Sequence, residues 1–200
     1  MGSTLELADW FTPFNELFLD DNDLDLFAPV LVLPTQTGIY PNLLAAVGKE
    51  GTIYILNQKG LGHFCAACTL KDTQIVQELT AAAPFGGALA FWNNTLYTSA
   101  TGAPIAAWSL TDGVLAATPF AKTAKVDSGH SPVISASGTT NGILWQLTGS
   151  SISAFNATTL KKLYNSGKLA SVVPHFANLV VVHGKVYVGT NTALVAYGLL

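Results

Sequence analysis

Short apolar runs separated by turn residues occupy most of this chain. Four segments repeat one arrangement: an apolar strand with a large side chain, a turn rich in Gly, Asn or Thr, and a second strand with an aromatic residue. These segments are residues 42–57, 94–110, 142–156 and 184–200. Two short apolar runs joined by such a turn are typical of a β-hairpin. The pattern therefore predicts four hairpins.

Large side chains recur at equivalent positions of the four hairpins. The first-strand anchors are Leu44, Tyr97, Trp145 and Tyr187, and the second-strand anchors are Tyr54, Trp108, Phe155 and Tyr197. The two anchors of one hairpin lie 10, 11, 10 and 10 residues apart, and successive second-strand anchors lie 54, 47 and 42 residues apart. Such regular spacing indicates an internal repeat of the chain.

Each hairpin is flanked by further apolar runs that complete a four-stranded unit. The runs before the hairpins are residues 29–34, 88–92, 132–136 and 178–182, and the runs after three of them are residues 74–79, 114–120 and 161–165. Four short strands repeated at this interval are typical of a β-propeller blade. We therefore expect an all-β propeller, with the anchor side chains packed between neighbouring blades. The expected blades are residues 28–80, 86–121, 131–167 and 172–200.

The two ends of the chain suggest how the array of blades is completed. The fourth repeat stops at Leu200, after its third strand, and an apolar segment, Leu5–Phe14, precedes the first repeat. Because an unpaired strand edge is a liability, we expect Leu5–Phe14 to pair with Ala193–Leu200 and close a four-bladed ring as a monomer. The alternative is half of a larger ring, completed by missing blades or by a second copy in a homodimer.

Composition and charge narrow the class of partner. Hydrophobic residues make up 50% of the chain and charged residues only 10%, with no arginine and a net charge of −3, so nucleic acid is not an expected partner.

Residues 1–25, within an acidic N-terminal segment 1–27, carry seven acidic residues and no lysine. They lack the basic start and apolar stretch of a secretion signal. No apolar run reaches the ~18 residues of a membrane span.

Several segments resemble the repeat of quinoprotein-type (PQQ-like) β-propellers. They include I-Y-I-L-N at residues 53–57, A-A-W-S-L-T-D-G at 106–113 and I-S-A-F-N-A-T-T-L-K-K-L-Y at 152–164. Together with D-W-F-T-P-F-N at 9–15 and G-K-V-Y-V-G-T at 184–190, they are similar to the C-terminal half of large secreted bacterial proteins of this class. The resemblance implies a propeller of PQQ-like blades and an extracytoplasmic location.

The same resemblance implies no bound cofactor. Quinoprotein dehydrogenases hold PQQ with an arginine, a calcium-bound carboxylate, a disulfide between adjacent cysteines and a stacking tryptophan. This chain has no arginine, and two residues separate Cys65 from Cys68. We therefore expect neither PQQ nor calcium. A remnant quinoprotein that oxidises alcohols or sugars, with cofactor contacts supplied by missing blades, is the alternative.

Two clusters of potential ligands have simpler interpretations. Cys65 and Cys68 lie in a predicted loop without the second Cys/His pair of a zinc site, so we expect loop cysteines that are free or locally oxidised. Asp21, Asp23 and Asp25 alternate as in calcium loops. An EF-hand-type calcium loop that begins at Asp20 would need glycine at its sixth position and glutamate at its twelfth. These positions hold Asp25 and Leu31. A solvated acidic loop is therefore favoured over a metal site.

The remaining candidates concern a binding surface. His130 and His175 lie next to prolines where first strands begin, and such loops of a propeller can face its central channel. We assign His130, His175 and Trp92 to a candidate ligand surface, against a purely structural role, and we assign no catalytic residue. The expected function is a non-catalytic scaffold that contacts a protein or a glycan through loops on one ring face. A half-propeller without any ligand is a further alternative.

Overall fold

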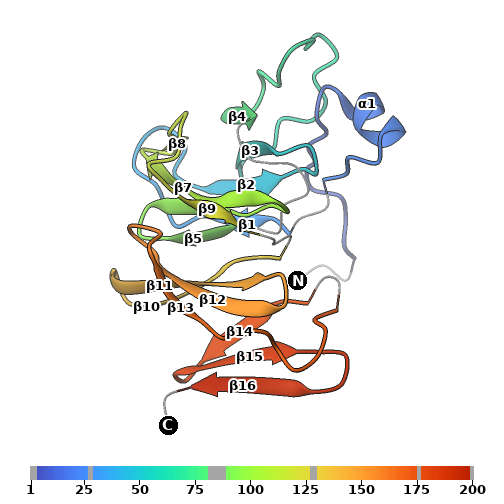
Figure 1. The fold of residues 1–200 in the computed structure, drawn as a ribbon. Helices are drawn as coiled ribbons and strands as arrows, with labels where there is room; N and C mark the ends of the chain where they lie inside the picture. The colour runs from blue at the N-terminus through green and yellow to red at the C-terminus, as the bar shows by residue number, and fades with distance from the viewer. Residues whose placement is uncertain (1–3, 27–28, 81–88, 127–129, 175–176, 199–200) are drawn as a thin grey trace.

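Four antiparallel sheets lie side by side, in chain order, in the computed structural model of this protein (Figure 1). The structure describes residues 4–26, 29–80, 89–126, 130–174 and 177–198. The first sheet consists of β1 (Leu31–Val32), β2 (Leu43–Val47), β3 (Thr52–Asn57) and β4 (Gln77–Thr80). The second consists of β5 (Ala90–Trp92), β6 (Thr95–Thr98), β7 (Ala103–Thr111), β8 (Val114–Leu115) and β9 (Ala121–Val126).

The third and fourth sheets follow the same meander. The third consists of β10 (Val133–Ser137), β11 (Thr140–Thr148), β12 (Ser151–Asn156) and β13 (Lys162–Asn165). The fourth has three strands among the described residues, β14 (Leu179–Val182), β15 (Lys185–Gly189) and β16 (Leu194–Gly198). A single short helix, α1 (Glu16–Asp21), is found in the described part of the chain and lies beside the first sheet (Figure 1). No helix in that part is long and apolar enough to cross a membrane.

The turns between first and second strands follow from local residue preferences. Asn93 and Asn94 join β5 to β6 with φ of 47° and 55°, and His183 and Gly184 join β14 to β15 with φ of 49° and 72°. Two consecutive positive φ angles characterise the type I′ turn, whose twist matches that of the flanking strands. Asparagine and glycine tolerate this conformation best. These residue pairs therefore fix the register of both hairpins.

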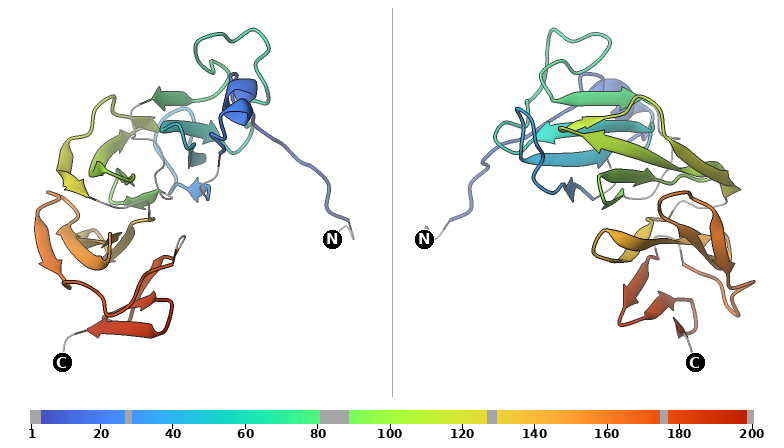
Figure 2. Two further views of the ribbon diagram at one scale, coloured as in Figure 1. Left: turned by 45° about the vertical axis from the view of Figure 1, so that its right-hand side comes forward. Right: turned by 90° about the vertical axis from the view of Figure 1, so that its left-hand side faces the viewer.

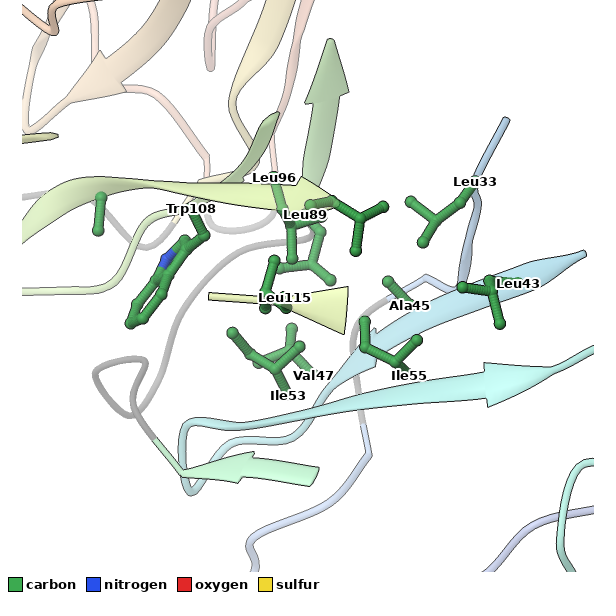
Figure 3. Packing of buried hydrophobic residues seen from close by; sticks show 12 residues of the cluster. Leu33, Leu43, Ala45, Val47, Ile53, Ile55, Leu89, Leu96, Trp108 and Leu115 are labelled. Carbon is green, nitrogen blue, oxygen red and sulfur yellow. The ribbon is translucent and has the colours of Figure 1, made fainter. Parts of the chain in front are cut away.

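Apolar side chains fill the spaces between neighbouring sheets. Trp108 and Leu96 of the second sheet and Ile53 and Ile55 of the first belong to one cluster (Figure 3). Tyr97 and Phe155 meet in the next cluster, between the second and third sheets, where the Tyr97 hydroxyl donates to the Ala157 carbonyl at 3.0 Å. Burial raises the pKa of Tyr97 to about 12. Each sheet is thus buried by its neighbours, as in stacked repeats.

The eight anchor residues divide by their position in the array. Those that lie between sheets are Tyr97, Trp108, Trp145, Phe155 and Tyr197. Leu44 and Tyr54 point to the outer face of the first sheet, and Tyr187 to the outer face of the fourth. The reason is that side chains alternate between the two faces of a strand, and an end sheet has a neighbouring sheet on only one face.

The outer strand of the second sheet differs from the sequence prediction. Residues 114–120 were expected to form it, but only Val114 and Leu115 pair, as β8, with the end of β7. The outer position beside the start of β7 belongs to β9, which extends to Val126, beyond the predicted blade end at residue 121. The cause is the length of β7, which has nine residues and can pair with two successive strands.

The predicted ring closure is wrong for the residues that the structure describes. Leu5–Phe14 forms no ladder with β16, which pairs only with β15. Instead Phe11 forms a parallel bridge with His63, and its ring packs on Tyr54 with 5.2 Å between ring centroids. The segment covers the outer face of the first sheet, where Tyr54 is 1% exposed. The first and fourth sheets lie at opposite ends of an open array (Figures 1 and 2).

Candidate binding cleft

A cleft of about 670 Å³ lies between the third and fourth sheets. Its aromatic wall consists of Trp145 from β11, Tyr164 from β13 and Tyr197 from β16. Val181 and Val186 add apolar surface from the fourth sheet. The Trp145 indole Nε1 donates a hydrogen bond to the Ser135 hydroxyl at 2.8 Å, which fixes the orientation of the ring. The cleft is therefore a mostly apolar surface in which the Trp145 ring is held in place.

The cleft lies where the other sheets carry an outer strand. In the first sheet Leu79 of β4 packs against the cluster shared with the second sheet, and in the second sheet Ala121 and Val126 of β9 pack against the next cluster. Among the described residues no strand lies beyond β16. Tyr197 is consequently only half-buried, whereas its counterparts Trp108 and Phe155 are each 2% exposed.

The outer face of the fourth sheet is also uncovered. Val180 and Val182 of β14 are 57% and 42% exposed, and Leu194 of β16 is 75% exposed. Strand pairing places these residues on the face that also carries Tyr187. At the other end of the array the N-terminal segment covers the equivalent face of the first sheet. The apolar surface at the C-terminal end is thus the exposed end of the stack.

The structure places His130 among hydrogen bonds between blades. His130 Nδ1 donates to the Ala177 carbonyl at 2.7 Å, and the His130 carbonyl accepts hydrogen bonds from Ser99 Oγ and Gln146 Nε2 at 2.7 and 2.6 Å. These bonds connect the second and third sheets to the segment before β14. His175 lies outside the described residues.

Trp92 packs between the second and third sheets. Its Nε1 donates to the Gly138 carbonyl at 2.8 Å, and its ring lies so close to Gly142 that a Cβ there would be 2.6 Å from the indole. Gly142 is therefore required by this close approach. The hydrogen bond and the close contact hold the indole against the third sheet.

Two of the acidic residues of the N-terminal segment are paired with Lys49. Lys49 Nζ lies 3.1 Å from Asp23 Oδ1 and 2.6 Å from Asp25 Oδ2, while Asp21 is exposed. The Lys49 hydrogen bond lowers the pKa of Asp25, and the two aspartates raise the pKa of Lys49. In the described ranges no three His, Cys, Asp or Glu side chains gather as a metal site. Asp21 ends α1, and Asp23 and Asp25 follow it in an exposed loop.

The structure contains an anchoring site that the sequence analysis did not identify. Asp9 accepts hydrogen bonds from the Leu61 amide at 2.8 Å and from His63 Nε2 at 2.9 Å, and the Trp10 ring stacks on His63. Hydrogen bonds from the Leu61 and Trp10 backbone amides lower the pKa of Asp9. The buried Asp72 accepts the Phe14 amide at 3.1 Å. These contacts attach the N-terminal segment to the loop between β3 and β4.

The same loop contains a disulfide. Cys65 and Cys68 are joined, so the locally oxidised form of the two predicted alternatives is present. The bridge closes a turn in which the Cys68 amide donates to the Cys65 carbonyl at 3.0 Å. The bridge therefore holds a local turn in the loop that carries His63.

Comparison with known proteins identifies the architecture. No known family profile matches the chain, and no curated protein sequence matches it. The structure is similar to BamB from Moraxella catarrhalis, with a TM-score of 0.52 and 15% identity over 86% of this chain and 46% of that chain. It is also similar to the Myceliophteria thermophila Cps50 (Swd1) beta-propeller domain, with a TM-score of 0.58 and 9% identity over 92% of this chain and 56% of that one.

A designed protein of similar size has the same arrangement. The computationally designed Ika4 protein matches with a TM-score of 0.53 and 14% identity, over 84% of this chain and 91% of that chain. The present chain thus spans about half the length of BamB and of the Cps50 domain, but nearly all of Ika4. At these identities the similarity concerns the fold alone, and the chain is a β-propeller built of four antiparallel sheets.

Proposed function

We propose that this propeller, with PQQ-like blades, is a non-catalytic scaffold that binds an extended apolar segment of a protein. The observation that carries the proposal is the aromatic cleft beside β16, the last strand of a three-stranded sheet in the described part of the chain. An extended peptide that adds to a free sheet edge gains main-chain hydrogen bonds, and pockets for alternate side chains provide specificity. The edge and the cleft together supply both kinds of contact.

The chemistry of the cleft favours a protein segment over a glycan. Its walls are mainly apolar and aromatic, from Trp145, Tyr164, Val181 and Tyr197. The Ser135 hydroxyl on the wall already accepts the hydrogen bond of the Trp145 indole. A glycan needs many hydrogen-bonding partners, because polar groups that lose water without new partners cost free energy. Apolar side chains at alternate positions of a peptide have no such requirement.

A matched pair of variants on β13 tests this proposal. Tyr164 lines the cleft and is 44% exposed, whereas its neighbour Leu163 is 56% exposed and is not part of the cleft. Peptides selected from a phage-displayed random library on the wild-type chain should carry alternating apolar residues. Calorimetry should find that Tyr164→Ala weakens their binding about tenfold and that Leu163→Ala leaves it unchanged. Equal effects of both variants, or selective binding of glycans, would overturn the proposal.

We further propose that the chain binds neither PQQ nor calcium and works outside the cytoplasm. The residues present do not fit the cofactor: the chain has no arginine, and the Cys65–Cys68 disulfide lies in a loop between β3 and β4. Asp23 and Asp25 already pair with Lys49. Disulfides persist mainly in oxidising compartments such as the periplasm or the extracellular space, which supports an extracytoplasmic location.

A further inference from the structure

The first observation is an exposed arm at the N-terminal end of the described chain. Residues 4–8 belong to no helix or strand, and Leu5 and Leu7 are 104% and 82% exposed. Both views of Figure 2 show this arm running away from the sheets. In an extended strand residues two apart point to the same side, so Leu5 and Leu7 form one apolar edge with Glu6 on the opposite side. The arm therefore has the pattern of an unpaired strand.

The second observation is that the arm does not join its own fourth sheet. Asp9 and Trp10 are held by His63 on the first sheet's loop. Among the described residues β16 pairs only with β15, and both views of Figure 2 show the arm pointing away from the fourth sheet. The described part of the arm is thus available to another molecule.

The third observation is the receiving edge. The fourth sheet has three strands in the described ranges where the others have four or five, and its last strand, β16, borders the cleft through Tyr197 and Gly198. Val195 and Tyr197 of β16 pack toward the third sheet. A fourth strand beside β16 with leucines two residues apart would continue this row of side chains along the cleft. The arm has this spacing.

The fourth observation is charge complementarity between the two ends of the chain. Residues 1–25 carry seven acidic residues and no lysine, whereas residues 89–200 carry six lysines and two aspartates. Lys185 is paired with Gly198 of β16 and lies on the outer face of the fourth sheet, the face that carries Tyr187. Opposite charges across an interface guide association and fix the register of the partners. With Leu5 and Leu7 turned toward the cleft, Glu6 of an added strand would lie on the same face as Lys185.

We propose that the occupant of the cleft is residues 4–8 of a second copy of this chain, added as a fourth strand to β16. This inference rests on the proposed protein-binding function and names its partner. In the described ranges each copy has one arm at the first sheet and one unpaired edge at the fourth, so two copies exchange arms and satisfy both edges in a closed dimer. Each array spans about half the length of the longer propellers it resembles, so two arrays together have the size of one such chain.

Sedimentation equilibrium of the full chain tests the exchange. The wild type should dimerise, and Leu5→Asp with Leu7→Asp should raise the dimer dissociation constant at least ~100-fold, because both leucines lose their burial at the interface. The matched control is Leu17→Asp with Leu70→Asp, two leucines that are 73% and 88% exposed outside the arm, and it should dimerise as the wild type does. Circular dichroism checks that all three chains fold.

The outcomes separate this inference from the proposed function. A monomeric wild type, or a dimer that survives the two arm substitutions, would overturn arm exchange. If selected peptides still bind the cleft and lose affinity in Tyr164→Ala, the protein-binding function stands without it. If the monomer binds no peptide either, both proposals fail. A synthetic peptide of residues 4–10 that dissociates the wild-type dimer, and binds Tyr164→Ala more weakly, would support the exchange directly.

Discussion

Gly142 illustrates how single residues set the spacing between blades. The Trp92 indole lies over it and donates to the Gly138 carbonyl, so the second and third sheets meet through a contact that excludes a Cβ. Neither the glycine nor the tryptophan reveals this from its own surroundings in the sequence, because the two are 50 positions apart. Trp92, a predicted ligand contact, packs between these two sheets.

Replacing this glycine should destabilise the fold. Gly142→Ala places a methyl group 2.6 Å from the indole, and relief of such overpacking costs about 1–3 kcal/mol. Urea unfolding measures the loss. The matched control is Gly189→Ala, also in a strand, where an added Cβ meets nothing within 4 Å; its free energy of unfolding should stay within about 0.5 kcal/mol of the wild type. Equal effects at both positions would contradict the Trp92 contact.

Glu78 gives the stability a specific pH dependence. Burial raises the pKa of Glu78, and the carboxylates of Asp72 and Glu50 act in the same direction. A carboxyl whose pKa is higher in the folded than in the unfolded state stabilises the fold when protonated, and this contribution is lost as the pH rises through both pKa values. Glu78→Gln replaces the carboxyl with an amide that does not ionise, so the variant does not lose this stability as the pH rises.

The expected result is a pH-dependent gain in stability. The free energy of unfolding of Glu78→Gln minus that of the wild type should be larger at pH 7 than at pH 4. Urea unfolding at both pH values measures this difference. Asp21→Asn, at an exposed position of the N-terminal segment, serves as the control and should show no such trend. A difference that shrinks as the pH rises would contradict the burial of the Glu78 carboxyl.

At the scale of elements, the N-terminal segment takes the place of a neighbouring sheet. Its Phe11 ring packs on Tyr54, and its backbone bonds to His63 and Asp72. The sequence indicated the apolar character of this segment but placed it at the wrong end of the array. Its actual partners are 43 to 58 positions away, and local periodicity carries no information about such long-range choices. Terminal repeats of stacked proteins need a cover of this kind.

Truncating the covering side chain should expose the first sheet. Phe11→Ala should lower the free energy of unfolding by about 2–4 kcal/mol, because it removes a large packed ring from Tyr54. Phe18→Ala is the matched control, since Phe18 in α1 is 54% exposed, and it should cost under about 1 kcal/mol. Guanidinium unfolding followed by far-ultraviolet circular dichroism compares the two. A smaller loss at Phe11 than at Phe18 would show that the segment does not support the sheet.

Strands with strong apolar alternation could be predicted, and weakly patterned ones could not. The hairpin of β11 and β12 is evident from Leu144, Trp145 and Phe155, because these side chains recur at the spacing of the repeat. Strand β9 reads A-K-T-A-K-V, with two lysines and little apolar alternation. Its position depends on the long neighbouring strand β7, which a local pattern does not reveal.

At the scale of the whole molecule, the repeat predicted the order of the sheets but not how the array ends. Regular spacing of Trp108, Phe155 and Tyr197 requires only that successive units be alike. Whether the last unit meets the first depends on contacts between distant segments, and here residues 9–14 attach to the loop that carries His63. The cleft beside β16 could not be predicted for the same reason, since its lining comes from two sheets, from Ser135 to Gly198, and depends on how they pack.

In the stack each sheet rests on its immediate neighbours. These contacts determine how the molecule responds to mechanical load. A force applied at the C-terminal end acts first on the sheet of β14–β16, which is held by a single flank. Nearest-neighbour coupling lets such an array come apart in successive steps instead of all at once. Under such a load the sheet of β14–β16 should therefore separate before the sheets that precede it in the array.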